Sequence, residues 1–187
     1  MRIIGGKMRG TKLQTLEGFD TTRPTLDRVK ESLFNIISIK IIDSKVLDLF
    51  SGSGALGIEA ISRGAEKAYL CDKSPKAINV IKQNIEKTRC KDSVVVLNKK
   101  HSQALEYFKQ NNKKFDIIFL DPPYETELAE FSTEYIIDNN LLEDDGIIII
   151  ETDNEEKLIK GLNVEKIEVY DTRKYGRVSL FFLKRKG

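Results

Sequence analysis

A regular alternation of short, largely apolar runs with amphipathic stretches begins at residue 45 and constrains the fold more than any other feature of the chain. The apolar runs have the character of strands buried on both faces, and the stretches between them have helical periodicity. This order is typical of a parallel sheet covered by helices on both sides. The expected strands are 45–50, 67–71, 94–97, 115–120 and 146–151. The expected helices are 55–63, one that starts at Pro75 with Ser74 as its N-cap, 102–111, 126–140 and 154–161.

Two further strands, near 164–171 and 177–184, complete the pattern. Too few residues separate them for a crossover helix, so we expect an antiparallel hairpin at one edge of the sheet, with Tyr175-Gly176 in its turn. The sequence therefore predicts the α/β class, with a Rossmann-like, mostly parallel seven-stranded sheet that carries an antiparallel C-terminal hairpin.

The residues before this pattern have a different character. Glycines at positions 5, 6, 10 and 18 predict short strands joined by turns. Pro24 then favours an extended Arg23, and the apolar spacing that follows Thr25 predicts a helix over 26–39. We expect a small, basic N-terminal β-hairpin extension over 1–21 and one main domain over 22–187.

Length and composition exclude several classes of protein. The chain has 187 residues, which suits one ordinary domain with a small appendage. No apolar run approaches the roughly 20 residues that span a bilayer, and the first residues lack the pattern of a secretory leader. Two cysteines and one histidine exclude a zinc finger and a histidine-rich metal site. We expect a cytoplasmic protein with no metal cofactor and no membrane association.

Charge is unevenly distributed, although the formal net charge is only +2. Residues 1–12 and 172–187 carry basic side chains and no acid, whereas 121–171 carry sixteen acids and three lysines. Basic ends of this kind bind a polyanion through counterion release. A solvated surface without a partner is an equally good interpretation of the same residues.

A glycine-rich loop, Asp48 to Gly57, joins the first predicted strand to the next helix. Gly52 and Gly54 allow the backbone to approach a ligand closely, and the helix presents free N–H groups. Asp72, at the end of the second strand, is placed to accept hydrogen bonds from ribose hydroxyls. The loop also matches the G-x-G-x-x-G pattern, with Asp72 twenty residues beyond Gly52, so nicotinamide dinucleotide binding is an alternative to S-adenosylmethionine binding. A tight turn without a ligand is the third interpretation.

A second motif, Asp121-Pro122-Pro123-Tyr124, follows the fourth strand. Two prolines stiffen the loop, so the Asp121 carboxylate and the Pro122 carbonyl become acceptors in fixed positions beside the Tyr124 ring. This set suits a planar group with an exocyclic NH2. An aryl amine is a poor nucleophile because its lone pair is delocalised, and hydrogen bonds from both N–H groups aim that lone pair at the methyl group of a sulfonium donor. In a nicotinamide enzyme this loop would have no role. The other interpretation is that the loop only ends the strand rigidly, which requires no ligand.

These motifs resemble the class I S-adenosylmethionine-dependent methyltransferases of the (D/N)PPY type, and within them the RsmD branch, which methylates guanine N2 in bacterial 16S ribosomal RNA. Nearly the whole chain shares the resemblance. The segments that carry it are Arg2-Ile3-Ile4-Gly5-Gly6, Arg9-Gly10, Arg23-Pro24-Thr25, Asp27-Arg28-Val29, Glu31, Leu33-Phe34-Asn35, Gly52-Ser53-Gly54-Ala55-Leu56-Gly57 and Asp121-Pro122-Pro123.

The resemblance implies a role for each group of residues. The catalytic set is Asp121, Pro122, Pro123 and Tyr124. The residues that bind S-adenosylmethionine are Asp48, Phe50, Ser51, Gly52, Ser53, Gly54, Asp72, Lys73, Lys100 and His101. Lys100-His101 departs from the family, since relatives usually carry Asp or Asn followed by a small residue there. The RNA-binding set is Arg2, Lys7, Arg9, Lys12 and Arg23.

The implied reaction gives S-adenosylhomocysteine as its second product, and the implied target is guanine 966 of 16S rRNA in the small ribosomal subunit or an assembly intermediate. We expect a monomer. Three alternatives remain open: a DNA adenine-N6 or protein glutamine methyltransferase with the same motif, an RNA-binding module without catalysis, and an NAD-dependent oxidoreductase.

Overall fold

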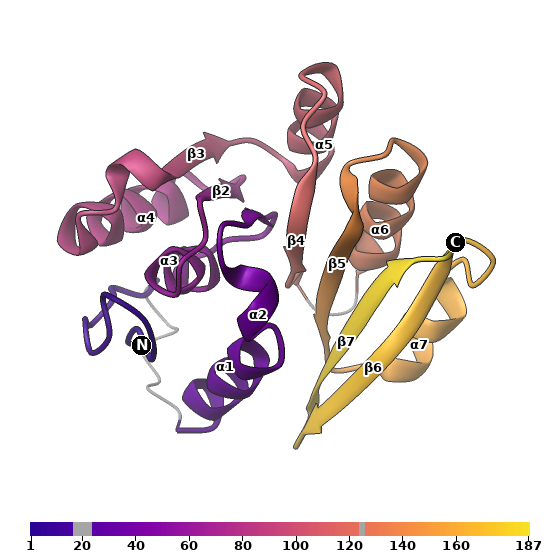
Figure 1. Cartoon of the computed structure of the whole chain (residues 1–187), viewed down its shortest axis with the longest axis horizontal. Helices are drawn as coiled ribbons and strands as arrows, with labels where there is room; N and C mark the ends of the chain where they lie inside the picture. The colour runs from indigo at the N-terminus through magenta and orange to yellow at the C-terminus, as the bar shows by residue number, and fades with distance from the viewer. Residues whose placement is uncertain (17–23, 124–125) are drawn as a thin grey trace.

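The computed structural model describes residues 1–16, 24–123 and 126–187. Its centre is one seven-stranded sheet in the order β3-β2-β1-β4-β5-β7-β6 (Figure 1). The first five strands are parallel, and β7 runs antiparallel to both of its neighbours. The strands are β1 Lys45–Asp48, β2 Lys67–Asp72, β3 Val94–Asn98, β4 Phe115–Leu120, β5 Leu142–Thr152, β6 Ile167–Tyr175 and β7 Val178–Arg185. The helices are α1 Pro24–Ile36, α2 Ser38–Ile41, α3 Ala55–Ser62, α4 Pro75–Thr88, α5 His101–Gln110, α6 Leu128–Asp138 and α7 Glu155–Gly161, with a 3-10 turn at Lys91–Ser93.

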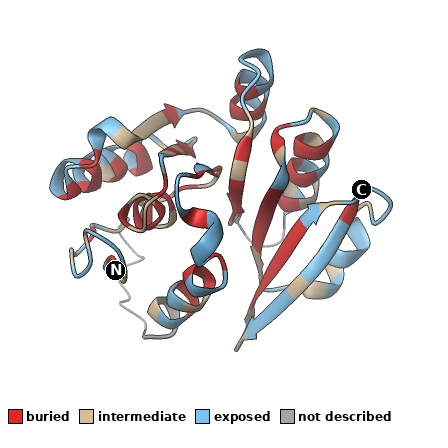
Figure 2. Ribbon diagram, in the orientation of Figure 1, coloured by how far each residue is buried: buried red, intermediate tan, exposed pale blue. Residues whose placement is uncertain are grey.

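Helices cover both faces of the sheet, as the predicted Rossmann-like fold requires. Because side chains alternate along a strand, each strand contributes to two separate cores. In β4, Ile117 and Phe119 join the core under α1 to α4, whereas Ile118 and Leu120 join the core under α5 to α7. Figure 2 shows that the central strands are buried while much of the edge strand β6 is exposed. Among the described residues, no helix has both the length and the apolar character of a membrane span.

Most predicted elements are present, and the main differences are at the start of β5, in the last strand pair and in the first predicted helix. β5 starts at Leu142, not at Gly146, because the acidic segment Glu143–Asp145 bulges out of the ladder between paired residues. The last strand pair lies further along the chain than expected, and its turn is formed by Gly176 and Arg177, with Gly176 at φ +64°. The predicted single helix over 26–39 is divided at Ile37 into α1 and α2, although Ile37 still donates to the Leu33 carbonyl at 3.2 Å.

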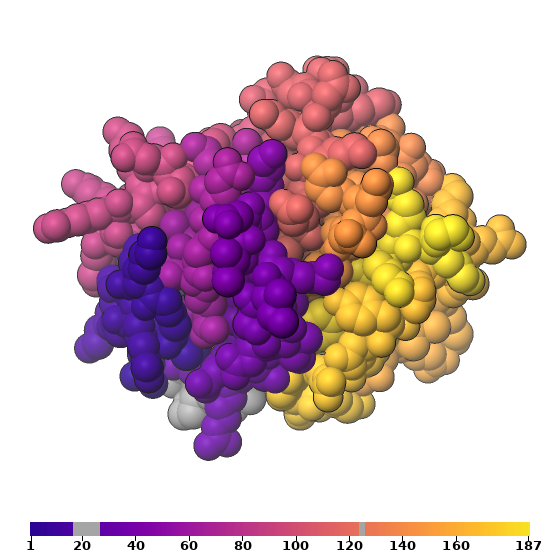
Figure 3. All heavy atoms as spheres, viewed as in Figure 1, coloured from indigo at the N-terminus to yellow at the C-terminus, as the bar shows by residue number. Residues whose placement is uncertain are grey.

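The N-terminal segment, residues 1–16, does not form the expected short strands. It makes one antiparallel bridge, between Arg2 and Lys12, with Ile3 N–H donating to the Thr11 carbonyl at 2.9 Å, while the residues that connect the two arms bind α3. Met8 N–H donates to Ser62 Oγ at 2.9 Å, and Lys7 N–H donates to the Ser62 carbonyl at 2.7 Å. Figure 3 shows this segment, in indigo, lying on the surface of the helical layer.

Glu59 of α3 is the centre of a buried ion cluster that holds the N-terminal segment in place. Its carboxylate lies 3.2 Å from Lys30 Nζ and 2.8 Å from Arg63 Nε, and it accepts hydrogen bonds from the N–H groups of Ile4 and Gly5. Glu59 is fully buried and Lys30 nearly so. Burial lowers the pKa of Lys30, and the neighbouring Glu59 charge opposes that shift. A buried carboxylate is tolerated only with such complete pairing.

Candidate functional site

The two sequence motifs leave the sheet side by side. β1 and β4 are adjacent parallel strands, with Asp48 in register with Phe119 and Leu49 N–H donating to the Phe119 carbonyl at 3.2 Å. Chain order reverses at this pair, since β2 and β3 lie on one side and β5 on the other. In open α/β sheets the crevice at the carboxyl ends of such a strand pair is the usual ligand site. The glycine loop and the Asp121-Pro122-Pro123 loop therefore border one crevice.

The glycine loop has the backbone that its sequence requires. Gly52 and Gly54 have φ angles of +54° and +79°, in the region that favours glycine. Gly57 allows α3 to pack on β2, because a Cβ at this position would lie 2.1 Å from Leu70 Cδ2. Ser51 Oγ donates to the Asp48 carbonyl at 2.6 Å and closes the start of the loop.

Asp72 connects this loop to the second strand. One carboxylate oxygen accepts from Gly52 N–H at 2.9 Å, and the other accepts from Ser74 N–H at 2.8 Å. Each carboxylate oxygen has a second lone pair, so both retain the capacity to accept from a diol. Ser74 is the N-cap of α4, as predicted.

Carboxyl groups follow three adjacent strands at this edge: Asp48 ends β1, Asp121 follows β4 and Glu151 lies near the end of β5. Asp48 is buried, and burial followed by the nearby Asp72 charge raises its pKa to about 7, against the opposing hydrogen bond from Gly57 N–H. Its Oδ1 atom has no hydrogen-bond partner in the part of the chain that the structure describes. Burial raises the pKa of Asp121 as well, and the charges of Glu151 and Asp48 add to that shift.

This row of acids distinguishes between the two ligands that the glycine loop alone leaves open. A dinucleotide would bring its diphosphate to the loop, and this anion would oppose ionisation of the nearby carboxyl groups. S-adenosylmethionine instead carries a sulfonium and an ammonium cation, and both cations favour the ionised form of Asp48 and Asp121. The electrostatics of the crevice therefore suit the sulfonium donor.

A cavity of about 150 Å³ opens beside the proline loop. Its lining includes Pro122 and Pro123 of the rigid loop, Glu151 of β5 and Lys157 of α7. Asp121 directly precedes the two lining prolines in the chain. Tyr124, the fourth residue of the motif, lies outside the described residues.

Aromatic rings border the other side of the crevice. The His101 ring lies 5.7 Å from the rings of Phe50 and Phe131, measured between centroids. Burial lowers the pKa of His101, and the charges of Lys73 and Lys100 lower it further, so neutral imidazole is favoured. The four predicted residues Phe50, Lys73, Lys100 and His101 thus lie near one another, at the carboxyl ends of β1 to β3.

Asn84 of α4 is a site residue that the sequence reasoning missed. Its side chain is fully buried and accepts from Gln14 N–H at 2.7 Å, while its amide donates to the Gln14 carbonyl and to the Ser53 carbonyl at 3.0 and 2.9 Å. One side chain therefore joins the N-terminal segment to the glycine loop. The signal was available, because Asn84 continues the buried stripe of Ile81 and Ile85 on α4.

The predicted RNA-binding residues lie outside the glycine loop and the proline loop. Arg2, Lys7, Arg9 and Lys12 are all exposed on the N-terminal segment. Arg2 also pairs with Asp27 of α1 at 3.3 Å. Arg23 lies outside the described residues.

Comparison with known proteins agrees with this arrangement. The family model described as "Conserved hypothetical protein 95" matches residues 1–184. YlbH of Bacillus subtilis is 36% identical over 189 residues, with 100% of both chains covered. Ribosomal RNA small subunit methyltransferase D of Haemophilus influenzae is 40% identical over 166 residues, which are 87% of this chain and 84% of that protein. The solved structure of YhhF from Escherichia coli superposes with a TM-score of 0.83 and 32% identity, covering 100% of this chain and 98% of the other. The chain therefore belongs to the Conserved hypothetical protein 95 family and is an RsmD-type methyltransferase with the S-adenosylmethionine-dependent class I fold.

Proposed function

We propose that the protein transfers a methyl group from S-adenosylmethionine to the N2 amine of a guanine in 16S ribosomal RNA. The observation that carries the proposal is the juxtaposition of the two loops on β1 and β4, with Asp48 in register with Phe119. It brings a glycine loop suited to the donor next to a rigid carboxylate loop suited to an amine. The relative from H. influenzae is named as a small-subunit rRNA methyltransferase, which supports the choice of RNA as substrate.

In this proposal the donor lies across the glycine loop. Asp72 holds the ribose hydroxyls, Asp48 faces the cationic end of the methionine moiety, and the rings of Phe50 and His101 border the adenine. The S-adenosylmethionine methyl group then points at the proline loop. Lys100 offers the adenine no acceptor on its side chain, so backbone groups near Lys99 and Lys100 supply the hydrogen bonds there.

At the acceptor side, the Asp121 carboxylate and the Pro122 carbonyl accept hydrogen bonds from the two N–H groups of the guanine amine. The lone pair is then oriented toward the methyl carbon, and the N–C bond forms as the C–S bond breaks, which leaves neutral S-adenosylhomocysteine. The methylated nitrogen then loses its extra proton to the Asp121 carboxylate. The N2 amine must leave its stack to reach the crevice, so the target nucleotide is flipped or already unpaired. The exposed basic side chains of the N-terminal segment contact the surrounding phosphates.

A labelling experiment tests the function. The protein is incubated with methyl-labelled S-adenosylmethionine and, separately, with assembled small subunits, naked 16S rRNA, duplex DNA and a protein extract. Label in N2-methylguanine of the 16S rRNA, in either RNA sample, is the expected result. Label confined to DNA adenine or to protein would contradict the proposal, as would RNA binding without transfer.

Donor binding is expected to strengthen as pH rises. The pKa of Asp48 is about 7 in the unliganded fold, against an ordinary value of 3.8. Because the folded protein holds this proton more tightly than the unfolded chain does, the carboxyl group stabilises the unliganded fold at pH values below 3.8. This contribution is lost as pH rises through about 7. A cation favours the ionised carboxyl, so binding releases protons, and affinity should rise by up to about tenfold per pH unit for each coupled proton.

Isothermal titration in two buffers of different ionisation enthalpy, between pH 5.5 and 8, measures both the affinity and the proton release. S-adenosylhomocysteine keeps the ammonium group and lacks only the sulfonium charge, so it should show a similar pH dependence if the ammonium group is the cation that faces Asp48. An affinity for S-adenosylmethionine that falls with pH would contradict the assignment.

A further inference from the structure

The cavity beside Pro122 and Pro123 is lined by two kinds of charged group. Glu151 of β5 brings a carboxylate to its lining, and Lys157 of α7 brings an ammonium group. β4 and β5 are adjacent parallel strands with Leu120 in register with Ile150, so Asp121 and Glu151 follow paired residues. Lys157 Nζ donates to the Thr126 carbonyl at 3.3 Å and has two further N–H groups to offer.

The order of these groups matches one face of one base. The Watson–Crick edge of guanine presents the N2 amine as donor, N1–H as donor and O6 as acceptor, in that order. Asp121 after β4, Glu151 on the neighbouring strand β5 and Lys157 on the helix that follows β5 offer acceptor, acceptor and donor. Flipped bases are commonly read along this edge.

We propose that Glu151 selects guanine by accepting the N1–H hydrogen bond and that Lys157 completes the reading by donating to O6. This inference rests on the proposed function, since it assumes that the amine at Asp121 belongs to a base. Adenine presents an unprotonated N1 toward the same carboxylate, and two acceptors that face each other without a proton repel. The pocket therefore favours guanine over adenine through a mismatch at Glu151 as well as through the correct contacts.

Glu151 also interacts electrostatically with Asp121. The Glu151 charge contributes to the raised pKa of Asp121, so the two carboxyl groups lie close to each other. Any change at Glu151 therefore alters the amine-binding carboxyl too, and the rate with guanine alone cannot separate the two roles. A ratio between two substrates that carry the same amine does separate them.

The test uses 2-aminopurine, which keeps the methylatable amine but has an unprotonated N1 and no O6. Small subunits are reconstituted with 16S rRNA that carries either guanine or 2-aminopurine at the methylated position found by labelling. The wild-type protein should prefer guanine by about 10- to 100-fold in kcat/KM. In Glu151→Gln the amide donates to the bare N1, and the preference should fall below about fivefold. Lys157→Met should slow guanine transfer and leave 2-aminopurine transfer unchanged.

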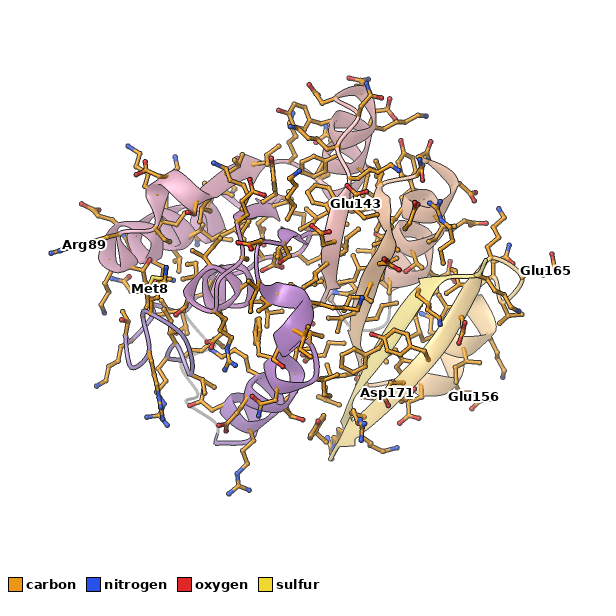
Figure 4. All side chains as sticks on the ribbon, viewed as in Figure 1. Met8, Arg89, Glu143, Glu156, Glu165 and Asp171 are labelled. Carbon is orange, nitrogen blue, oxygen red and sulfur yellow. The ribbon has the colours of Figure 1, made fainter. Side chains whose placement is uncertain are left out.

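Glu143→Gln is the matched control. It removes the same charge from the same strand, and Figure 4 labels Glu143 at the start of β5, far from α7, where Glu156 is labelled. This variant should keep the wild-type preference. If Glu151→Gln methylates guanine and 2-aminopurine in the wild-type ratio, Glu151 does not read the base, and the guanine-N2 activity still stands. If the wild-type protein leaves guanine unmethylated, the proposed function fails and this inference fails with it.

Discussion

Asp121→Ala is expected to lower kcat for methyl transfer by about a thousandfold while the affinity for S-adenosylmethionine stays close to that of the wild type. Asp121 follows β4, the strand next to β1, and in the proposed function its side chain contacts the acceptor amine and not the methyl donor. Its removal takes away one of the two acceptors that orient the amine. Single-turnover transfer to small subunits and equilibrium titration of the donor give the two numbers separately.

Asp121→Asn is the companion variant, because it keeps the shape and one acceptor oxygen. It should retain more activity than the alanine variant, since a single oxygen still orients one N–H bond. A loss of donor affinity in Asp121→Ala that matches its loss of rate would show that Asp121 holds the donor, contrary to the assignment. Equal loss in both variants would show that a carboxylate charge is needed, and orientation by hydrogen bonding would then not suffice.

Glu59→Ala is expected to lower the free energy of unfolding by about 3–5 kcal/mol. The substitution leaves Lys30 buried with no carboxylate beside it and strands the N–H groups of Ile4 and Gly5. For a chain of this size the melting temperature should fall by roughly 10 °C or more. Thermal and urea unfolding, followed by circular dichroism, measure the change.

Glu156→Ala is the control for this effect. Glu156 and Lys160 form an ion pair at the same spacing of four residues as Glu59 and Arg63, but both side chains of that pair are largely exposed. Its loss should cost at most about 1 kcal/mol. If Glu59→Ala does not fold, Glu59→Gln keeps one acceptor oxygen and should give a measurable, smaller loss. Equal stability of the Glu59 and Glu156 variants would contradict the role of the buried cluster.

Much of the fold could be predicted because its signals are local. The strand Phe115–Leu120 is apolar on both faces, Ser74-Pro75 marks a helix start, and the short link before Val178 permits only a hairpin. The seven-stranded, mostly parallel sheet with its C-terminal hairpin is confirmed, and the structure adds that β1 lies beside β4. The start of β5 was missed because Glu143–Asp145 has the composition of a loop, and a bulge accommodates these acids within a strand.

The site was less predictable because several of its residues act through partners distant in sequence. Asn84 forms hydrogen bonds with Gln14 and Ser53, which lie 70 and 31 positions earlier in the chain. Glu59 binds backbone groups more than 50 positions earlier. In the sequence both are single polar residues on apolar helix faces. Glu151 did carry a signal, since it ends the run Gly146–Glu151 just as Asp48 ends its own strand. The roles of the individual site residues, and the division of the chain at residue 21, remain predictions.

The buried amide of Asn84 has a consequence for how the chain can be dissected. Ile3 and Leu13 belong to the same core as α3 and α4, and Asn84 ties Gln14 to the Ser53 carbonyl. The first sixteen residues are therefore not a detachable module. A protein shortened at this end would expose part of its interior and remove one restraint on the glycine loop, which in the proposed function holds the methyl donor, so residues 22–187 alone would be an incomplete enzyme.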